Sequence, residues 1–145
     1  MQIRQLGHAV LKVRDLERSE AFYSGVLGLP VAARLERPAM TFFTMGNHHD
    51  FALMQVAADA PDADKASPGL LHVAFKVGDS TDELRTVKEE LDAAGVTIDS
   101  LTDHTVSHSI YLRDPDGNGI ELYVDVSEAW RDDPQLVASI APLQL

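Results

Sequence analysis

The chain has 145 residues, of which 45% are hydrophobic, 12 are basic and 23 are acidic, which gives a net charge of −11; it has no cysteine. The missing cysteines exclude a disulfide scaffold, thiolate zinc sites, cysteine-ligated iron–sulfur clusters and a cysteine nucleophile, and the negative charge disfavours binding to nucleic acid or to an anionic membrane. No stretch approaches the roughly 18 apolar residues of a membrane helix, and the first residues lack the apolar core of a signal peptide, so we expect a soluble, cytoplasmic protein.

The first part of the chain predicts a strand, a helix and three further strands. Residues 6–13 form a short apolar run rich in β-branched residues, which is typical of a strand. Asp15 can cap a helix that Gly28 ends. The apolar face of this helix comprises Phe22, Tyr23, Val26 and Leu27. The three strands that follow are predicted over residues 31–36, 40–45 and 50–56.

A polar segment, residues 57–68, precedes a second series of the same elements. The segment is rich in Ala, Asp and Pro, so we interpret it as a linker or as a flap over a site. A strand is predicted at 70–77, and the next helix begins with a capping box of Ser80 and Glu83 and ends at Gly95. Three strands are then predicted at 96–100, 107–113 and 118–125, the last two joined by a turn that contains Pro and Gly.

The two series form an internal repeat. His8 and His72, 64 positions apart, lie early in the first strand of each series, and a Lys, a Val and an Asp follow both at the same spacing. We therefore expect an α+β fold in which each module has the order β-α-β-β-β. The expected organisation is a single domain at 1–125, with modules at about 1–56 and 69–125, followed by a tail at 126–145.

Two histidines and one carboxylate suggest a metal site. A lone histidine in an apolar strand is more often a core residue than a ligand, but pseudo-symmetric packing of the two first strands can bring His8 and His72 to one centre. Alternation along the last strand places Glu121 on the face opposite Ile120 and Leu122. Glu121 is then either an outward residue of an edge strand or a carboxylate directed into a cavity, where with two imidazoles it would suit a divalent metal.

These motifs resemble the vicinal oxygen chelate superfamily, which includes glyoxalase I, fosfomycin-resistance enzymes, bleomycin-binding proteins and extradiol dioxygenases. The resemblance is carried by the runs around His8 and His72 and by the Asp-Pro-Asp-Gly-Asn-Gly-Ile-Glu run at 114–121. It covers about residues 3–125. It implies two modules that form a cupped mixed sheet around one metal, with His8, His72 and Glu121 as the ligands.

One position of the first module favours a particular reaction class. Aligning the two modules puts Ala52 opposite Glu121, at a place where glyoxalase I-like and epimerase-like members generally carry a fourth ligand. Ala52 cannot bind metal. The resemblance then implies a three-ligand site with open positions, which suits ferrous iron that holds a chelating substrate and dioxygen together. Mn(II) or another divalent metal is the alternative.

A second motif resembles the His-His-x-x-Ala-Leu run of extradiol ring-cleaving dioxygenases. It comprises His48, His49, Ala52 and Leu53. In this resemblance His49 is the acid/base group, His104 contacts the substrate, and Tyr111 hydrogen-bonds the catecholate. Histidine titrates in the range needed for such proton transfers. The structural alternatives are loop histidines at 48 and 49, a surface histidine at 104 and a core aromatic at 111.

The chain most resembles the one-domain branch of the type I extradiol dioxygenases. The expected function is iron(II)-dependent extradiol ring cleavage, with a catechol-like small molecule and dioxygen as partners. We expect residues 57–68, the tail 126–145 or another subunit to supply the pocket walls, and a homodimer or larger homo-oligomer. Two alternatives remain: a metal-free binding protein of the bleomycin-resistance type, and a glyoxalase-like or thiol-transferring metalloenzyme, against which Ala52 argues.

Overall fold

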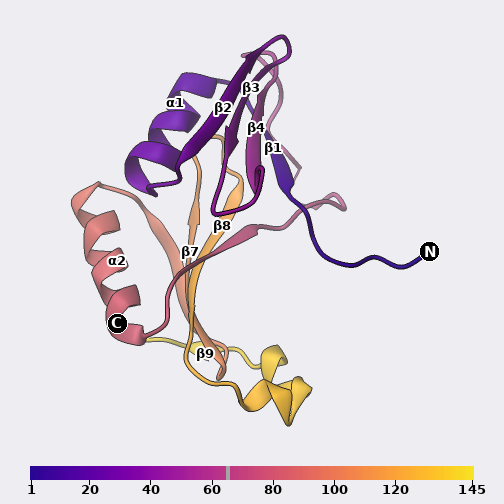
Figure 1. The fold of residues 1–145 in the computed structure, drawn as a ribbon. Coiled ribbons are helices and arrows are strands. Elements are labelled where there is room, and N and C mark those ends of the chain that lie inside the picture. Colours follow the sequence, from indigo (N-terminus) through magenta and orange to yellow (C-terminus); the bar gives the residue numbers. More distant parts are fainter. Residues whose placement is uncertain (65) are drawn as a thin grey trace. The chain divides into compact units, whose positions relative to one another are not determined.

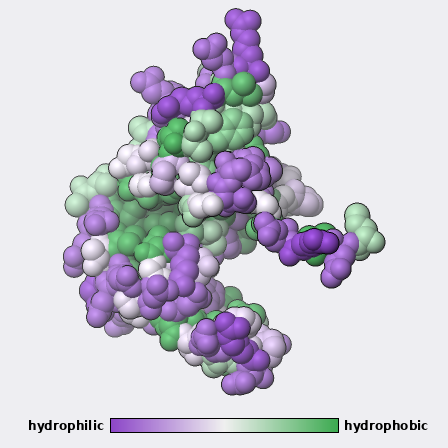
Figure 2. Space-filling model, in the orientation of Figure 1, coloured by the Kyte–Doolittle hydropathy of each residue, from purple (hydrophilic) through white to green (hydrophobic). Residues whose placement is uncertain are grey.

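The computed structural model describes residues 1–64 and 66–145, and these divide into two compact units (Figure 1). The first unit comprises Met1–Ser67 together with Pro115–Gly117, and the second comprises Pro68–Asp114 together with Asn118–Leu145. Figure 2 shows both hydrophilic and hydrophobic side chains on the face that it draws. Within the described residues, every helix is too short or too polar to cross a membrane.

The first unit contains one mixed four-stranded sheet with the strand order β1-β4-β3-β2. β1 runs parallel to β4, whereas β4 with β3 and β3 with β2 pair antiparallel. The elements of this unit are β1 (Ala9–Val13), α1 (Leu16–Glu20), the π-helical turn η1 (Ala21–Val26), β2 (Val31–Glu36), β3 (Ala39–Phe43) and β4 (Phe51–Gln55). The predicted order of strand, helix and three strands is confirmed.

The predicted first helix is divided into an α-helical turn and a π-helical turn. Asp15 caps α1 as expected, since its side chain accepts from the Arg18 N–H at 3.0 Å. The helix then widens, so that the Leu27 N–H reaches the Phe22 carbonyl, five residues back. Tyr23 becomes fully buried, with its ring centroid 4.9 Å from that of Phe51. The expected apolar face is therefore only partly buried, because Val26 remains 41% exposed.

The second unit repeats this architecture and adds one strand. Its sheet has the order β5-β8-β7-β6-β9, with β5 parallel to β8 and the other pairs antiparallel. The elements are β5 (Val73–Gly78), α2 (Thr81–Ala93), β6 (Ile98–Asp103), β7 (Ser107–Arg113), β8 (Gly119–Asp125) and β9 (Ala141–Pro142). The α+β class with two β-α-β-β-β modules, predicted from the repeat, is confirmed.

The helix α2 forms as its sequence predicts. The Ser80 side chain accepts from the Glu83 N–H, and the Glu83 carboxylate accepts in return from the Asp79 N–H at 2.8 Å. These bonds satisfy donors at the helix start, as a capping box does. Leu84 and Leu91 are buried, and α2 packs on β5, β7 and β8. The helix thus covers one face of the sheet and leaves the other face for the cavity described below.

The tail packs on its own unit. Two 3-10 turns, Ala129–Arg131 and Pro134–Ala138, lead to β9, which pairs antiparallel with β6. A further bond joins the Leu143 N–H to the Leu101 carbonyl at 3.2 Å. These contacts attach the tail to the sheet of the second unit.

The register of the two sheets agrees with the alignment of Ala52 with Glu121. In the first sheet Ala52 lies between Val10 and Phe42, and in the second sheet Glu121 lies between Ala74 and Tyr111. Val10 and Ala74 both lie two residues after the histidine that begins each repeat. Ala52 and Glu121 therefore occupy equivalent positions in the two modules.

Candidate metal centre and cavity

His72 and Glu121 lie together in the second unit. The His72 Nε2 atom is 3.0 Å from Glu121 Oε2, with side chains that are 31% and 12% exposed. Alternation along β8 explains the position of the carboxylate, because Ile120, Leu122 and Val124 are buried toward α2 whereas Glu121 points to the opposite face. Glu121 is therefore not an outward residue of an edge strand: β8 lies between β5 and β7, and the carboxylate lines a cavity.

Two hydroxyl groups hold the other oxygen of this carboxylate. Ser109 donates to Glu121 Oε1 at 2.7 Å, and Tyr111 donates to the same oxygen at 2.9 Å. The Ser109 side chain is fully buried. Oε1 is therefore committed to hydrogen bonds, whereas Oε2 faces the imidazole nitrogen. Sequence reasoning missed Ser109, although its place two residues before Tyr111 on the same strand puts both side chains on one face.

Tyr111 connects the carboxylate to His104 and, through it, to the tail. Burial, followed by the hydrogen bond to Glu121, raises the pKa of Tyr111 to about 12, so the phenol stays protonated and available as a donor. His104 Nε2 lies 3.0 Å from the Tyr111 oxygen, and His104 Nδ1 lies 2.7 Å from the Ser139 carbonyl. Because a carbonyl only accepts, His104 Nδ1 donates to the Ser139 carbonyl. Tyr111 has a single hydroxyl proton, so it donates either to Glu121 Oε1 or to His104 Nε2 at any one time.

A cavity of about 830 Å³ opens beside these groups in the second unit. This volume lies within the range of small-molecule sites, roughly 300–1,000 Å³. The tail supplies part of the wall, which places it beside the predicted site residues. The lining comprises His72, Lys76, Asp79, His104, Val106, Ser107, Tyr111, Glu121, Asp125, Val126, Ser127, Glu128, Trp130, Arg131 and Val137.

A glycine sets how closely His72 approaches the last strand. A Cβ atom built on Gly119 would lie 2.3 Å from the Leu71 carbonyl oxygen and 3.1 Å from His72 Cβ. We expect Gly119→Ala to displace the backbone that carries His72 and to weaken metal binding by about 10- to 100-fold, as loss of a group that orients a ligand does. Metal titration of this variant tests the expectation. Gly117→Ala, strained at a positive φ but with nothing near its Cβ, serves as a control for general destabilisation. Unchanged metal affinity in Gly119→Ala would contradict the positioning role.

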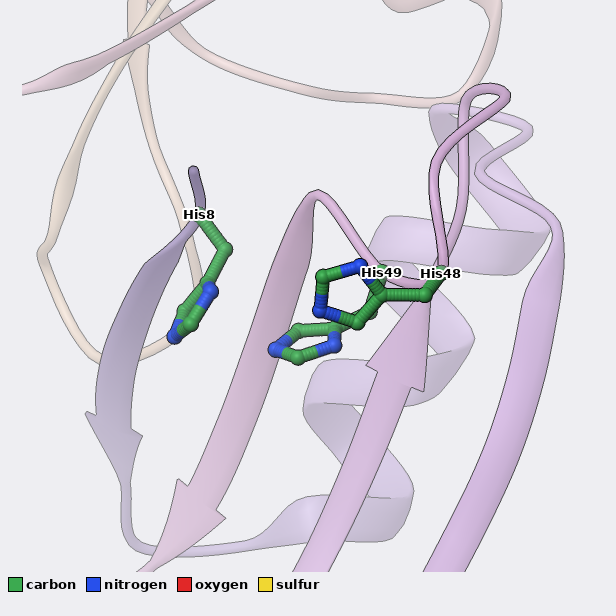
Figure 3. A group of neighbouring side chains, drawn as sticks. All are labelled: His8, His48 and His49. Atoms are coloured by element: carbon green, nitrogen blue, oxygen red, sulfur yellow. The ribbon is translucent and has the colours of Figure 1, made fainter. Parts of the chain in front are cut away.

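The first unit gathers three histidines of its own. His8 precedes β1, and His48 and His49 lie just before β4 (Figure 3). One ligand atom from each lies within 4.8 Å of the others. Burial lowers the pKa of His49, and the charges of His8 and His48 lower it further, so the neutral base is favoured. His8 belongs to the first unit and His72 with Glu121 to the second, so the three-ligand set that joins them stays a prediction.

The chain matches a known family over a range that includes His8, His72 and Glu121. Residues 5–122 fit the model of the Glyoxalase/Bleomycin resistance protein/Dioxygenase superfamily, which is most of the chain. The chain belongs to this superfamily. The predicted resemblance is thereby confirmed at family level. A crystal structure of the glyoxylase/bleomycin resistance protein/dioxygenase domain from Frankia sp. EAN1pec has the same fold, with a TM-score of 0.72 at 23% identity over 86% of this chain and 99% of that chain.

Curated members of the superfamily that resemble this chain include dioxygenases and a transferase. The chain is 36% identical to the catechol-2,3-dioxygenase of Bacillus subtilis (strain 168), over 83% of this chain and 41% of that relative. It is 35% identical to biphenyl-2,3-diol 1,2-dioxygenase 3 of Rhodococcus globerulus, over 83% of this chain and 63% of that relative. It is 31% identical to the glutathione transferase FosA of Serratia marcescens, over 84% of this chain and 82% of that relative. The chain thus spans less than two thirds of the length of the two dioxygenases.

The donor set of the second unit fits the divalent metal that many members of this superfamily use. An imidazole Nε2 faces a carboxylate oxygen across 3.0 Å, and the remaining carboxylate oxygen is oriented by two hydroxyl donors. Ligating carboxylates in proteins are commonly oriented by such outer hydrogen bonds. His72 and Glu121 can therefore supply two ligands of a metal site.

Proposed function

We propose that this chain is an iron(II)-dependent extradiol dioxygenase that cleaves the ring of a catechol-like aromatic compound. The observation that carries the proposal is the chain of contacts from Glu121 through Tyr111 to His104, on the wall of a cavity sized for a small aromatic molecule. Similarity to two catechol-cleaving dioxygenases supports the same reaction class. In the proposed reaction both atoms of dioxygen enter the product, and the ring carbon–carbon bond beside the diol breaks.

His8, His72 and Glu121 would hold the metal. Bound ferrous iron would supply a Lewis acid and a redox centre at which a catechol and dioxygen meet. Tyr111 remains a proton donor across the physiological range, so its hydroxyl can turn from Glu121 toward a ring oxygen of the substrate. His104, oriented by the Ser139 carbonyl, accepts from the same hydroxyl or contacts the substrate. His49 is proposed to take one catechol proton and return it later.

Oxygen uptake tests the reaction directly. The protein is loaded with ferrous iron without air, mixed with catechols that carry substituents of increasing size, and then exposed to oxygen. We expect uptake of one dioxygen per substrate and a yellow ring-opened product. Absence of uptake with every catechol, in protein with verified iron content, would contradict the proposal.

A thiol transferase is the second candidate, because the chain covers 82% of the length of the glutathione transferase FosA. The same protein, loaded with Mn(II), is incubated with glutathione and an electrophilic substrate. Loss of free thiol that needs both the metal and the electrophile, together with absent oxygen uptake, would favour this function. Tight binding of a bulky ligand without either reaction would favour a binding protein of the bleomycin-resistance type.

The tail should determine how well the substrate is held. Trp130 and Val137 line the cavity, and the Ser139 carbonyl orients His104. We expect deletion of residues 130–145 to lower kcat/KM while iron content is retained, because His72 and Glu121 lie outside the deleted segment. Trp130→Ala leaves the strand pairing of β9 in place and should raise KM by roughly tenfold, as loss of an aromatic anchor does. Normal turnover, KM and oligomeric size in both variants would show that the tail has no such role.

A further inference from the structure

The histidine cluster of the first unit has features of a metal site. The ring centroids of His8 and His49 are 4.2 Å apart, and those of His48 and His49 are 4.5 Å apart. Figure 3 shows the three imidazole rings gathered at the start of β1, with nitrogen atoms directed into the space between them. His8 and His48 are exposed and His49 is half-buried, so an ion can reach the cluster from solvent.

The loop that carries two of these histidines is internally braced. Asp50 Oδ2 accepts from the Met45 N–H at 2.6 Å and from the Asn47 N–H at 3.3 Å. The Thr44 hydroxyl donates to the Asn47 carbonyl at 2.5 Å. These bonds fix the turn before β4 on which His48 and His49 stand. The backbone positions of His48 and His49 are thus set by the hydrogen bonds of the loop.

An outer hydrogen bond also selects the ligand atom of His48. Its Nδ1 lies 3.2 Å from the Asn47 side-chain oxygen. If Nδ1–H donates to this oxygen, Nε2 is left with a free lone pair for a metal. Metal-binding histidines usually donate their second ring N–H to a carbonyl or carboxylate, which fixes the tautomer and strengthens the ligand. Asn47 therefore occupies the place of an orienting group.

We propose that His8, His48 and His49 form a second metal-binding set that takes Zn²⁺ or a similar late divalent transition metal. Three imidazoles with a water molecule are an established tetrahedral environment for zinc. Zinc–nitrogen bonds of 2.0–2.1 Å place the donor atoms of such a site about 3.4 Å apart. The ligand atoms of the three histidines lie within 4.8 Å of one another, and small rotations of the exposed His8 and His48 rings would bring them to that distance. Imidazole sites favour zinc over ferrous iron in the usual order of divalent affinities.

This inference goes beyond the proposed function and does not depend on it. His8 is shared between the three-histidine set and the proposed ferrous set, so one ion excludes the other from that ligand. Zinc bound at His8, His48 and His49 would consequently compete with iron for His8. The test therefore first removes the other two proposed iron ligands, His72 and Glu121.

The experiment uses the full chain with His72→Ala and Glu121→Gln combined. Calorimetric titration with Zn²⁺ alone, at mildly alkaline pH where imidazoles are neutral, should show one ion bound per chain. Co²⁺ in place of Zn²⁺ should give the visible absorption of a four-coordinate site. Adding His8→Ala, His48→Ala or His49→Ala removes a proposed ligand and should weaken zinc binding by at least about tenfold. Loss of a residue that only hydrogen-bonds a metal ligand already weakens metal binding by roughly 10- to 100-fold.

Two further variants give matched controls. Asn47→Ala should weaken zinc binding while leaving all three imidazoles in place. His108→Ala removes a histidine that contacts Thr81 and Asp103 in the second unit, and it should leave zinc binding unchanged. Absence of binding in the combined variant, or binding that none of the three histidine substitutions weakens, would overturn the proposal. Because no turnover is measured, failure of the dioxygenase proposal would leave these outcomes unaffected.

Discussion

Glu121→Ala protein loaded with ferrous iron should lose its iron almost completely on dialysis and should show no ring cleavage. The substitution removes one of three proposed ligands and also the acceptor of the Ser109 and Tyr111 hydroxyls. A three-ligand site has no spare protein donor to replace the carboxylate. His72→Ala should behave in the same way, because it removes the nitrogen that faces Glu121 Oε2.

Metal analysis and thermal unfolding measure this effect together. Metal binds only the folded state, so wild-type protein at a free metal concentration a hundred times the Kd gains about 2.7 kcal/mol. The variants should lack this gain and unfold at the same temperature with and without iron. Glu121→Gln keeps the size of the side chain and separates the loss of charge from the loss of packing. Full iron retention by Glu121→Ala and His72→Ala would contradict the assignment.

His8→Ala distinguishes the two metal sets. It should lose ferrous iron as Glu121→Ala does, because His8 is the proposed third ligand. Unlike Glu121→Ala, it should also lose zinc binding at the three-histidine set, to which His8 contributes one ligand atom. A His8→Ala protein that keeps iron but loses zinc would place His8 in the second set alone.

His49→Gln should retain iron and catechol binding but lose ring-cleavage rate by roughly two to four orders of magnitude, the usual effect of removing a proton-transfer group. Glutamine fills a similar volume and can hydrogen-bond, but it cannot take up a proton at neutral pH. His49 is only half-buried, and the Asp50 side chain stabilises the loop by accepting from the Met45 N–H. The substitution should therefore leave the melting temperature nearly unchanged. Anaerobic titration with catechol measures binding, and oxygen uptake measures turnover.

His48→Gln is the matched control for this variant. It changes the neighbouring imidazole, which has no proposed part in proton transfer, and should leave the rate within a few-fold of wild type. An unchanged rate of product formation in His49→Gln, with iron content verified, would remove His49 from the mechanism. An equal loss in both variants would indicate that the loop and not the base is responsible.

The element order could be predicted from sequence because each element is specified locally. Asp15 and the pair Ser80 and Glu83 mark the helix starts, and the alternation around Glu121 fixes which face of β8 is buried. These signals depend on residues only a few positions apart. They therefore predict the same helices and strands whatever the arrangement of the modules.

Other features depend on contacts that sequence spacing does not encode. The π-helical turn places Tyr23 against Phe51, a partner 28 positions away. The contact of Ser139 with His104 requires the tail to turn back onto β6. The gathering of His8 with His48 and His49 depends on the hydrogen bonds of the Asp50 side chain, which set the loop conformation. The motif alone predicted a role for His49 but not this cluster.

The equivalent positions of the two sheets also bear on how the protein could change over evolutionary time. Where the second sheet has Ser109, Tyr111 and Glu121, the first has Met40, Phe42 and Ala52. A carboxylate introduced at buried position 52 would find neither hydroxyl, and such an uncompensated charge costs several kcal/mol. Restoring polar chemistry to the first module would need three substitutions, and the change at position 52 would be harmful alone. If the modules descend from one duplicated ancestor, single mutations would not readily restore a polar site in the first module once its hydroxyl and carboxylate side chains had been lost.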